Sequence, residues 1–324
     1  MPIRPKIPVM IVTGFLGAGK TTFINQLLSQ NNGVKIGIIE NEFGEISIDS
    51  RLISDYRPER IMELNNGCIC CTLFNEFSLT LQELVKRHHH LEHLIIETTG
   101  VADPAPIIEP FYQDEDLKRI FELNGTVCLI DAANFLEHAN SAIPQKQIIL
   151  SDLIILNKQS SVDGNTLKDI CRKLNTLNKT AIVVKADHAR LDSLHLYMLQ
   201  PQLQDEFAKR LRKPFYSESS SSDFHSFTIR FGGLLDEARF SEWFPYFASL
   251  YKSKIFRIKG LVNYENNPMI GIVQSIGGTT SLTEGPVINP HDPLENVIVF
   301  IGKGISKYQI EKEINEFLMQ ESDQ

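Results

Sequence analysis

Two short segments carry residues whose types and spacing could do chemistry. Residues 14–21 read Gly-Phe-Leu-Gly-Ala-Gly-Lys-Thr and match a phosphate-binding loop at all of its fixed positions. Further along the chain, Cys68-Ile69-Cys70-Cys71 places three thiols close together. The first segment predicts binding of a nucleoside triphosphate, and the second predicts binding of a soft metal ion.

The phosphate-binding loop lies between a predicted strand and a predicted helix. Residues 9–12 are a short apolar run typical of a buried parallel strand, and residues 22–30 carry apolar side chains at helical spacing. The glycines let backbone N–H groups point at the phosphates, and the helix directs its positive end toward them. We predict that Lys20 reaches the β- and γ-phosphates and that Thr21 binds Mg²⁺. The predicted nucleotide-binding residues here are Gly14, Phe15, Leu16, Gly17, Ala18, Gly19, Lys20, Thr21 and Thr22.

The three thiols of the second segment are too close together for ordinary disulfides. A bridge between Cys70 and Cys71 would need a strained ring, and one between Cys68 and Cys70 is little better. A reducing compartment, expected for an acidic chain without a signal peptide, disfavours disulfides further. The thiolates therefore predict a Zn²⁺ or Cu(I) site completed by an oxygen, a nitrogen or a water, with redox chemistry, persulfide chemistry or packing as alternatives. Cys128 and Cys171 lie in apolar strand-like and helix-like patterns, and we predict that both are buried.

Composition narrows the class of protein. The chain has 324 residues, of which 42% are hydrophobic, so it can bury a full core and its length suggests two domains. Its 32 Lys and Arg against 40 Asp and Glu give a net charge of −8, which argues against a nucleic-acid scaffold with a basic face. The first residues lack an apolar signal-peptide core, and no apolar run is long enough for a membrane span. We therefore expect a cytoplasmic protein that binds neither nucleic acid nor membranes.

Short runs of Val, Ile and Leu alternate with helical patterns up to about residue 213. The predicted strands cover residues 9–12, 35–40, 94–97, 127–131, 153–157 and 181–185, and further helices cover residues 72–87 and 165–177. Such alternation is typical of an α/β fold with a parallel sheet, helices on both faces, and ligands at the carboxyl ends of the strands. The residues that fall at these ends are Gly14, Glu40, Glu97, Asp131 and Asn157.

The pattern changes in the last third of the chain. Residues 214–222 contain a Ser-rich polar stretch without core-forming side chains, which is typical of a linker. After it, one strand alternates apolar and polar residues, three more strand patterns follow at 255–262, 269–275 and 297–301, and two helices carry apolar faces. We predict a P-loop domain with the cysteine site at 1–213, the linker at 214–222, and a smaller α+β domain at 223–324 with two helices on one face of its sheet.

Several motifs occur together in a fixed order. After the loop at residues 14–22 come Glu-Asn-Glu-Phe-Gly-Glu at 40–45, Asn-Gly-Cys-Ile-Cys-Cys at 66–71 and Glu-Thr-Thr-Gly at 97–100. This order resembles the CobW-type metal-chaperone GTPases, and the match to their bacterial zinc-chaperone branch is close. Residues 257–260 and 299–302 resemble the C-terminal domain of that family, so the resemblance covers nearly the whole chain. It implies a P-loop NTPase fold, GTP hydrolysis, and delivery of zinc, or in some branches cobalt, to client proteins.

The resemblance also implies roles for three carboxylates. Glu40 and Glu42 stand in the family's first switch segment, where they would complete the zinc shell or hold Mg²⁺ and its water, and solvated loop carboxylates are the plain alternative. Glu97 takes the Walker B place, and Gly100 lets its loop move with the γ-phosphate. The implied catalytic residues are Lys20, Thr21, Glu42 and Glu97. The implied zinc ligands are Glu40, Glu42, Cys68, Cys70 and Cys71.

One segment departs from the family pattern. The guanine-reading motif of these GTPases is Asn-Lys-x-Asp, whereas this chain has Asn157-Lys158-Gln159-Ser160. We keep Asn157 and Lys158 as nucleotide-binding residues. A carboxylate accepts hydrogen bonds from both N1–H and N2–H₂ of guanine, whereas a hydroxyl accepts only one well and carries no charge. The loss is expected to cost roughly 1.5 to 3 kcal/mol, which leaves ATP use or relaxed specificity open. Asp163 is a nearby carboxylate, but it comes three residues late.

Four histidines lie between a predicted helix and a predicted strand. His88, His89, His90 and His93 are expected to cap a solvated helix end rather than to bind zinc.

The motifs and the resemblance together predict a zinc chaperone that uses GTP, Mg²⁺ and Zn²⁺. GTP hydrolysis would move the switch segment and loosen the metal for transfer to a client metalloprotein of unknown identity. The C-terminal domain carries no catalytic motif, so we assign it to client docking or to formation of a homodimer. The alternatives are a zinc buffer or sensor with a regulatory nucleotide site, and an insertion chaperone for cobalt or another metal.

Overall fold

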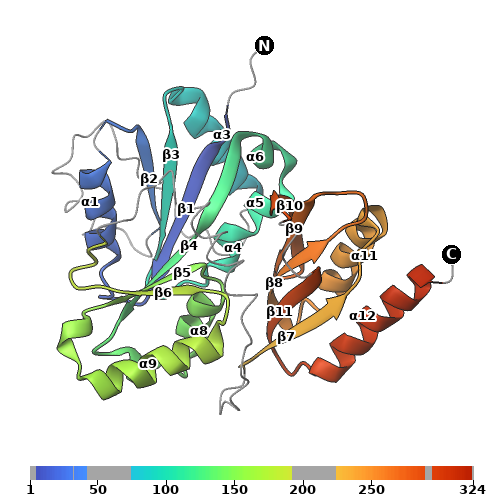
Figure 1. The fold of residues 1–324 in the computed structure, drawn as a ribbon. Coiled ribbons are helices and arrows are strands. Elements are labelled where there is room, and N and C mark those ends of the chain that lie inside the picture. The colour runs from blue at the N-terminus through green and yellow to red at the C-terminus, as the bar shows by residue number, and fades with distance from the viewer. Residues whose placement is uncertain (1–4, 32, 42–73, 192–223, 289–293, 323–324) are drawn as a thin grey trace. The chain divides into compact units, whose positions relative to one another are not determined.

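The protein is described by a computed structural model that covers residues 5–31, 33–41, 74–191, 224–288 and 294–322. These residues form two compact units, one with strands β1 to β6 and one with strands β7 to β11 (Figure 1). The predicted linker at 214–222 and the predicted domain boundaries beside it lie outside the described residues. Those boundaries therefore stay predictions.

The first unit is built on a six-stranded sheet with the order β2-β3-β1-β4-β5-β6, in which all pairs are parallel. The strands are β1 (Ile7–Gly14), β2 (Ile36–Asn41), β3 (His93–Thr98), β4 (Phe121–Asp131), β5 (Leu153–Asn157) and β6 (Ile182–Lys185). Every residue of β3 and β5 is buried, as expected for strands covered on both faces. The predicted α/β class is therefore confirmed.

Helices cover this sheet on both faces. They are α1 (Lys20–Gln30), α3 (Phe74–Arg87), α4 (Ala105–Ile108), α5 (Pro110–Gln113), α6 (Glu115–Ile120), α7 (Phe135–His138), α8 (Ala142–Ile149) and α9 (Gly164–Leu177). Met10 and Val12 of β1 share a buried cluster with Phe23 of α1. Phe111 of α5 packs edge-to-face with Phe77 of α3 and with Phe121 of β4.

Strand β4 is much longer than the predicted run at residues 127–131. Its first half pairs with β1 through Phe121, and a bulge at Asn124 shifts the register between Leu123 and Gly125. The polar residues around this bulge interrupt the apolar run, which hides the first half of the strand from a pattern of continuous hydrophobicity. The same region before β4 contains the short helices α4 to α6, which no sequence pattern predicted.

The second unit is an antiparallel five-stranded sheet with the order β10-β9-β8-β11-β7. Its strands are β7 (Phe224–Gly232), β8 (Ile255–Asn263), β9 (Met269–Ile276), β10 (Thr279–Val287) and β11 (Glu295–Lys303), and its helices are α11 (Glu237–Leu250) and α12 (Lys307–Ser322). The two segments that resemble the family's C-terminal domain lie on β8 and β11, and these strands pair directly through Ile258 and Phe300.

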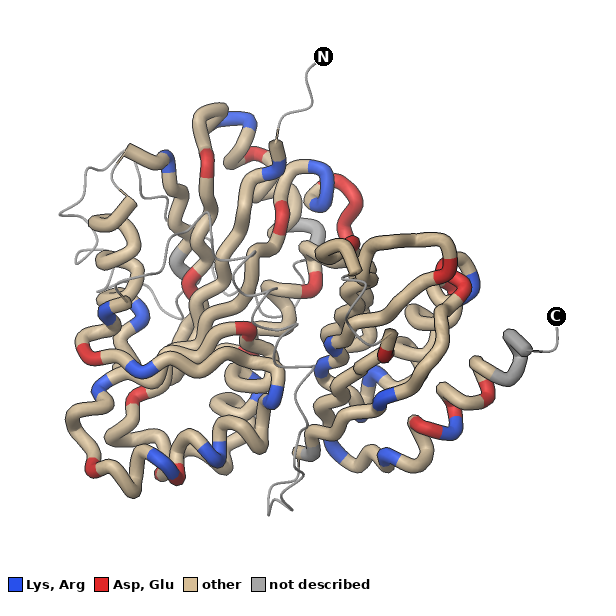
Figure 2. Tube along the Cα trace, viewed as in Figure 1, with Lys and Arg blue, Asp and Glu red and all other residues tan. Residues whose placement is uncertain are grey.

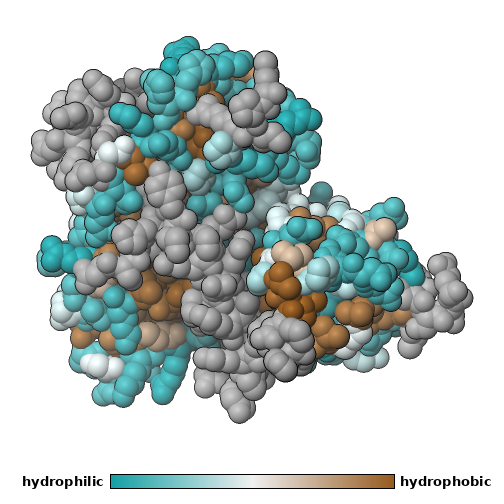
Figure 3. Space-filling view, turned by 45° about the horizontal axis from the view of Figure 1, so that its top comes forward, coloured by the Kyte–Doolittle hydropathy of each residue, from teal (hydrophilic) through white to brown (hydrophobic). Residues whose placement is uncertain are grey.

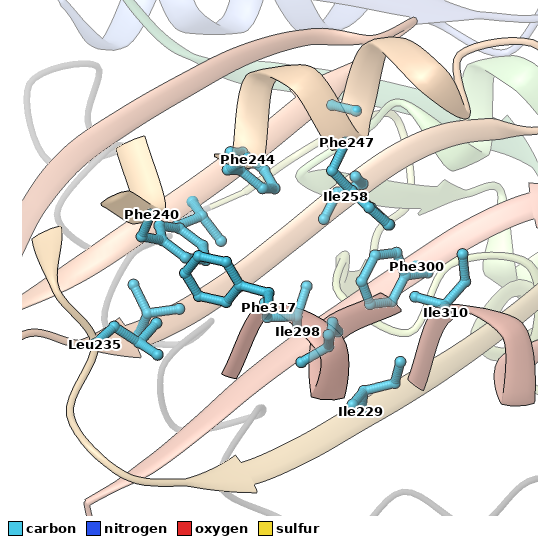
Figure 4. Close-up of a cluster of buried hydrophobic side chains, with 14 of the residues drawn as sticks. Ile229, Leu235, Phe240, Phe244, Phe247, Ile258, Ile298, Phe300, Ile310 and Phe317 are labelled. Carbon is cyan, nitrogen blue, oxygen red and sulfur yellow. The ribbon is translucent and has the colours of Figure 1, made fainter. Parts of the chain in front are cut away.

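An aromatic cluster joins both helices of this unit to one face of the sheet. Phe240, Phe244 and Phe247 from α11 and Phe317 from α12 surround Phe300 and the aliphatic residues of the strands (Figure 4). Phe240 stacks on Phe244 with 5.5 Å between ring centroids, and its edge meets Phe317 at 6.0 Å. The predicted arrangement of two helices on one face is present, and its stability rests on aromatic burial.

Strand β10 was missed in the sequence because it is an edge strand. Most of its residues are polar or half-exposed, so it shows no apolar alternation. It pairs with β9 across Gly277-Gly278, both of which have positive φ. A Gly-Gly pair between two short strands is the local signal of a tight hairpin turn and could have identified it.

Charged and apolar side chains are interspersed on the described surface. Figure 2 shows acidic and basic residues mixed along α12, where Lys307 pairs with Glu311 and Lys312 with Glu316. The face drawn in Figure 3 is mostly hydrophilic, with apolar patches over both units. None of the described helices combines the length and the apolarity needed to cross a membrane.

Candidate functional site

The phosphate-binding loop turns tightly between β1 and α1. Ala18 donates its backbone N–H to the carbonyl of Phe15, and α1 begins at Lys20 directly after Gly19. The Lys20 side chain is buried and its Nζ donates to the carbonyl oxygen of Gly14 at 3.1 Å. The side chain of Lys20 therefore folds back over the loop that a phosphate group would occupy.

Two glycines of this loop stand where any larger residue would collide with neighbouring strands. Gly14 has φ of 137°, and a Cβ atom there would lie 2.2 Å from the carbonyl oxygen of Leu129. Gly19 has φ of 102°, and a Cβ atom there would lie 2.6 Å from Nδ2 of Asn157. Both positions need glycine for conformation and for space. These glycines let the loop fold tightly against β4 and β5 with the Lys20 side chain beside it, and a glycine loop of this kind before a helix fits a phosphate group.

The loop after β3 lies against the phosphate-binding loop. Thr98 Oγ1 donates to Thr13 Oγ1 at 2.9 Å, which links the ends of β3 and β1. Further on, a Cβ atom at Gly100 would lie 2.7 Å from the backbone nitrogen of Leu16. Gln147 of α8 donates to the carbonyl oxygen of Gly100 at 3.3 Å and so holds this loop from the other side. The contact between Gly100 and Leu16 brings the predicted Walker B segment directly onto the phosphate-binding loop.

Glu97 is the penultimate residue of β3, which lies between β1 and β2 in the sheet. It is buried, and its Cα partners are Val12 of β1 and Glu40 of β2. The backbone register thus places two predicted site residues, Glu40 and Glu97, directly opposite each other at the carboxyl ends of neighbouring strands. The backbone of Glu40 is described, and its side chain lies outside the described part of the structure.

Asn157 joins the phosphate-binding loop to the loop after β6. Its Nδ2 donates to the carbonyl oxygen of Ala18 at 3.0 Å, and its Oδ1 accepts from the backbone N–H of Ala189 at 2.8 Å. The Asn157 side chain is buried and both of its polar ends are used. The Asn157 amide therefore holds together the phosphate-binding loop, the loop after β5 and the loop after β6.

Lys158 forms an ion pair that the sequence did not predict. Its Nζ donates to Oδ2 of Asp131 at 2.7 Å, and Asp131 also accepts from Asn134 and from the backbone N–H of Ala133. Burial acts to raise the pKa of Asp131, but the hydrogen bonds from Lys158, Asn134 and Ala133 outweigh it and lower the pKa. Lys158 itself has φ of 56°, so the backbone turns sharply at this residue.

Ser160 is the residue that departs from the family motif, and it lies beside a carboxylate. Its backbone N–H and its hydroxyl both donate to Oδ1 of Asp187, at 3.1 and 2.8 Å. Asp187 follows β6 and was missed in the sequence because it is distant from the motif along the chain. Asp163, which the sequence left open, accepts from the backbone of Asn165 and Thr166 at the start of α9. It caps that helix.

The predicted metal segment lies outside the described residues. This holds for Glu42, Cys68, Cys70 and Cys71, so the proposed zinc ligands stay a prediction. Among the residues that the structure does describe, no group of three or more His, Cys, Asp or Glu side chains is placed to hold a metal ion.

Two sequence predictions about single residues were wrong. His93 is the buried first residue of β3 rather than part of a solvated helix end, and burial lowers the pKa of His93 to about 4. His88, His89 and His90 are exposed after α3, as predicted. Cys171 is half-buried on α9 rather than buried, whereas Cys128 in β4 is buried as predicted.

Comparisons with known proteins identify the family. Residues 8–185, more than half of the chain, match the CobW/HypB/UreG nucleotide-binding domain, and residues 224–318 match the cobalamin synthesis protein cobW C-terminal domain. The chain belongs to the CobW/HypB/UreG family. The resemblance predicted from the motifs is thereby confirmed.

Similar proteins match most of the length of this CobW-family chain. It is 34% identical over 268 residues to the zinc chaperone YjiA of Escherichia coli (strain K12), which is 81% of this chain and 83% of that protein. It is 29% identical over 306 residues to the zinc chaperone CobW of Sinorhizobium sp, which is 84% of this chain and 86% of that protein. The crystal structure of Zn(II)-bound YjiA GTPase from E. coli superimposes with a TM-score of 0.73 and 25% identity, over 97% of this chain and 99% of that one.

Proposed function

We propose that this protein is a zinc chaperone that binds Zn²⁺ at Cys68, Cys70 and Cys71 and transfers it to a client metalloprotein under control of GTP. The observation that carries the proposal is the contact of Gly100 with the phosphate-binding loop, in a chain whose relatives are named zinc chaperones. Through this contact, a movement of the phosphate-binding loop on GTP binding would displace the loop after β3. Strand β3 pairs with β2, and the predicted metal segment follows β2 in the sequence.

The nucleotide half of the mechanism uses residues at the start of α1. Lys20 exchanges its hydrogen bond to the Gly14 carbonyl for bonds to the β- and γ-phosphates of GTP, and backbone N–H groups of the loop donate hydrogen bonds to the remaining phosphate oxygens. Thr21 and the carboxylates Glu42 and Glu97, at or just beyond the ends of β2 and β3, would hold Mg²⁺, which would neutralise charge that develops on the transferred phosphoryl group. Glu42 and Glu97 orient the attacking water and the ion in this proposal.

The coupling half runs through strands β2 and β3. A γ-phosphate that pulls on the loop at Gly100 acts on β3, because Glu97 and Thr98 immediately precede that loop. Strand β3 pairs with β2 at Glu97 and Glu40, so a shift at the end of one strand is felt at the end of the other. The chain then continues into the predicted metal segment, where Glu40 or Glu42 would complete the zinc shell.

Thiolate chemistry makes the metal half of the proposal sensitive to protons. Zinc binds deprotonated thiols, so uptake by Cys68, Cys70 and Cys71 should release protons and weaken in acid. The C-terminal unit, with its separate core, is our proposed surface for docking the client or a second copy of the chain.

The deciding experiment measures zinc affinity in two nucleotide states. The purified protein competes for Zn²⁺ with a chelating dye in the presence of Mg²⁺-GDP and then of a non-hydrolysable GTP analogue. We expect a shift of at least tenfold, about 1.4 kcal/mol of coupling, and by linkage zinc must change the affinity for the GTP analogue by the same factor. Equal zinc affinities in both states would defeat nucleotide-driven transfer.

Two variants divide the proposal into its parts. Cys70→Ser with Cys71→Ser should lose tight zinc and keep Mg²⁺-GDP binding. Lys20→Ala should lose GTP hydrolysis and client activation while zinc binding persists. Full client activation by the Lys20→Ala variant would instead point to a zinc buffer or sensor. A panel of metal ions at constant pH, showing nucleotide-dependent preference for cobalt over zinc, would redirect the proposal to another metal.

A further inference from the structure

The loops after β5 and β6 are joined at the place where a GTPase reads its base. Besides the two bonds from Ser160 to Asp187, the backbone N–H of Gln159 donates to the carbonyl oxygen of Ala186 at 3.3 Å. Asn157 adds the bond from Ala189 and ties both loops to the phosphate-binding loop at Ala18. The two loops therefore form one rigid frame beside the phosphate site.

Backbone strain is concentrated in this frame. Among the described residues, four that are not glycine have positive φ, and three of them are Lys158, His188 and Ala189, with values of 56°, 53° and 55°. Such conformations are unfavourable for ordinary side chains and persist where the surrounding structure imposes them. The three residues flank Ser160 and Asp187 in sequence, so the strain is stored where these two side chains are positioned.

We infer that Asp187 is the carboxylate that reads guanine in this protein, and that Ser160, which occupies the place of the motif's aspartate, positions it. The inference rests on the proposed function, because it concerns recognition of the same GTP. The base-reading carboxylate would then come from the loop after β6, whereas the Asn-Lys-x-Asp motif supplies it from the loop after β5. The loss of guanine selectivity expected from the sequence then does not follow.

The chemistry of the pair suits this role. The Ser160 backbone N–H and hydroxyl, followed by Gln159, lower the pKa of Asp187, so the carboxylate is ionised at neutral pH. An ionised carboxylate accepts from guanine N1–H and N2–H₂ with charge assistance. Adenine presents an acceptor at N1 and has no 2-amino group, so the same carboxylate disfavours it. Asp187 is half-buried at the loop surface, which leaves it reachable by a base.

Asp163, the carboxylate that follows the motif in sequence, has both of its oxygens in use, whereas the two bonds from Ser160 both fall on Oδ1 of Asp187. Asp163 accepts from Asn165 and Thr166 at the start of α9, including the Thr166 hydroxyl at 2.6 Å. Moving it to the base would uncap that helix. Asp131 is likewise held by Lys158 at the other side of the frame. Asp187 is the described carboxylate in this frame that is bound to the motif position itself.

The test compares three nucleoside diphosphates on one variant. Asp187→Asn should weaken GDP binding by about 10- to 100-fold, leave ADP binding equal to or tighter than that of the parent protein, and improve binding of xanthosine diphosphate. Xanthine has a carbonyl at C2 in place of the amino group, so an asparagine amide complements it where a carboxylate does not. Affinities are measured by fluorescence titration, and an ADP affinity no weaker than that of the parent protein reports an intact phosphate site. GDP affinity equal to that of the parent protein would overturn the inference.

Two further variants exclude simpler explanations. Asp163→Asn, which keeps a capping side chain beside the same motif, should leave all three affinities unchanged. Asp187→Ser should lose GDP selectivity, and adding Ser160→Asp should restore it by returning the carboxylate to the motif position. A swapped double variant no more selective than Asp187→Ser would show that the two residues do not exchange roles, against the inference.

The outcome is separable from that of the zinc proposal. A parent protein that binds GDP selectively but shows no coupling between nucleotide and zinc defeats the chaperone mechanism and leaves Asp187 in place. A parent protein that binds GDP and ADP equally overturns the inference about Asp187, whatever its zinc affinity. Zinc affinity of the Asp187→Asn variant without nucleotide should match that of the parent, because the change lies outside the predicted metal segment.

Discussion

The two sheets of this protein use their apolar residues in different ways. In the parallel sheet, strands such as β3 and β5 are buried along their whole length, so polar groups concentrate where the strands end. In the antiparallel sheet, one face is covered by α11 and α12 through a cluster of aromatic rings. We therefore expect nucleotide binding in the first unit to depend on the loops at the carboxyl ends of its strands. The stability of the second unit should depend on the single face of its sheet that packs against α11 and α12.

The largest expected effect comes from breaking the aromatic face. Phe240 is buried and contacts Phe244, Phe317, Trp243 and Tyr264. Phe240→Ala removes these contacts and leaves a cavity, which should destabilise the second unit by about 3 to 5 kcal/mol. The chain has a single tryptophan, Trp243, which packs in this cluster, so urea unfolding followed by its fluorescence reports on this unit.

The same helix offers the control for this change. Tyr246 on α11 is 69% exposed, so Tyr246→Ala should change stability by less than about 0.5 kcal/mol. Neither variant should alter GDP affinity in water, because nucleotide binding belongs to the loops of the first unit. A loss of GDP affinity in the folded Phe240→Ala protein would contradict the division of labour between the two sheets.

The second prediction concerns the loop edge of the parallel sheet. A Cβ atom at Gly100 would press on the backbone and side chain of Leu16, with its nearest contact at 2.6 Å. Gly100→Ala should therefore displace the loop after β3 and slow GTP turnover by about 10- to 100-fold, with GDP affinity little changed. Steady-state phosphate release and GDP titration measure the two quantities.

The control is a glycine with open space around it. A Cβ atom at Gly164, the first residue of α9, would have no neighbour within 4 Å. Gly164→Ala should leave both turnover and GDP affinity unchanged. If Gly100→Ala hydrolysed GTP at the parent rate, the contact between the two loops would not be part of the mechanism.

Buried central strands were predicted from the sequence, whereas an edge strand and an irregular strand were missed. The central strands of the parallel sheet were recognisable because continuous Val, Ile and Leu runs have few other uses. Strand β10 and the first half of β4 were not, because an edge position and a bulge replace that pattern with polar residues. The prediction that His93 helps to cap a solvated helix end was wrong, because no neighbouring residue indicates that β3 begins at His93.

The candidate site shows the corresponding limit for chemistry. Gly14, Lys20 and Asn157 were predicted because their motifs are continuous in sequence, and the structure gives each of them a described contact with another loop of the site or within its own. Asp187 could not be predicted, because it meets Ser160 through pairing of β5 with β6, a relation between residues far apart in the chain. Motifs record local spacing, whereas the sheet order brings separate strand ends together.

The smallest expected effect concerns His93, which lies at the amino-terminal end of β3, away from the strand ends that carry the candidate site. Burial lowers the pKa of His93 to about 4 from 6.5, so below pH 6.5 the unfolded chain takes up a proton that the folded chain does not. Stability should therefore fall as the pH drops from 6.5 toward 4, and His93 should contribute about 1 to 2 kcal/mol to this loss. His93→Gln, which cannot titrate, should flatten the dependence, while His90→Gln at an exposed position should not.

The pH dependence of stability is measured from urea unfolding midpoints, followed by far-UV circular dichroism at pH 7, 6 and 5. If stability depended on pH equally in the His93→Gln and parent proteins, the pKa of His93 would be the same in the folded and unfolded chains. The amino-terminal end of β3 would then tolerate a buried positive charge, against this prediction.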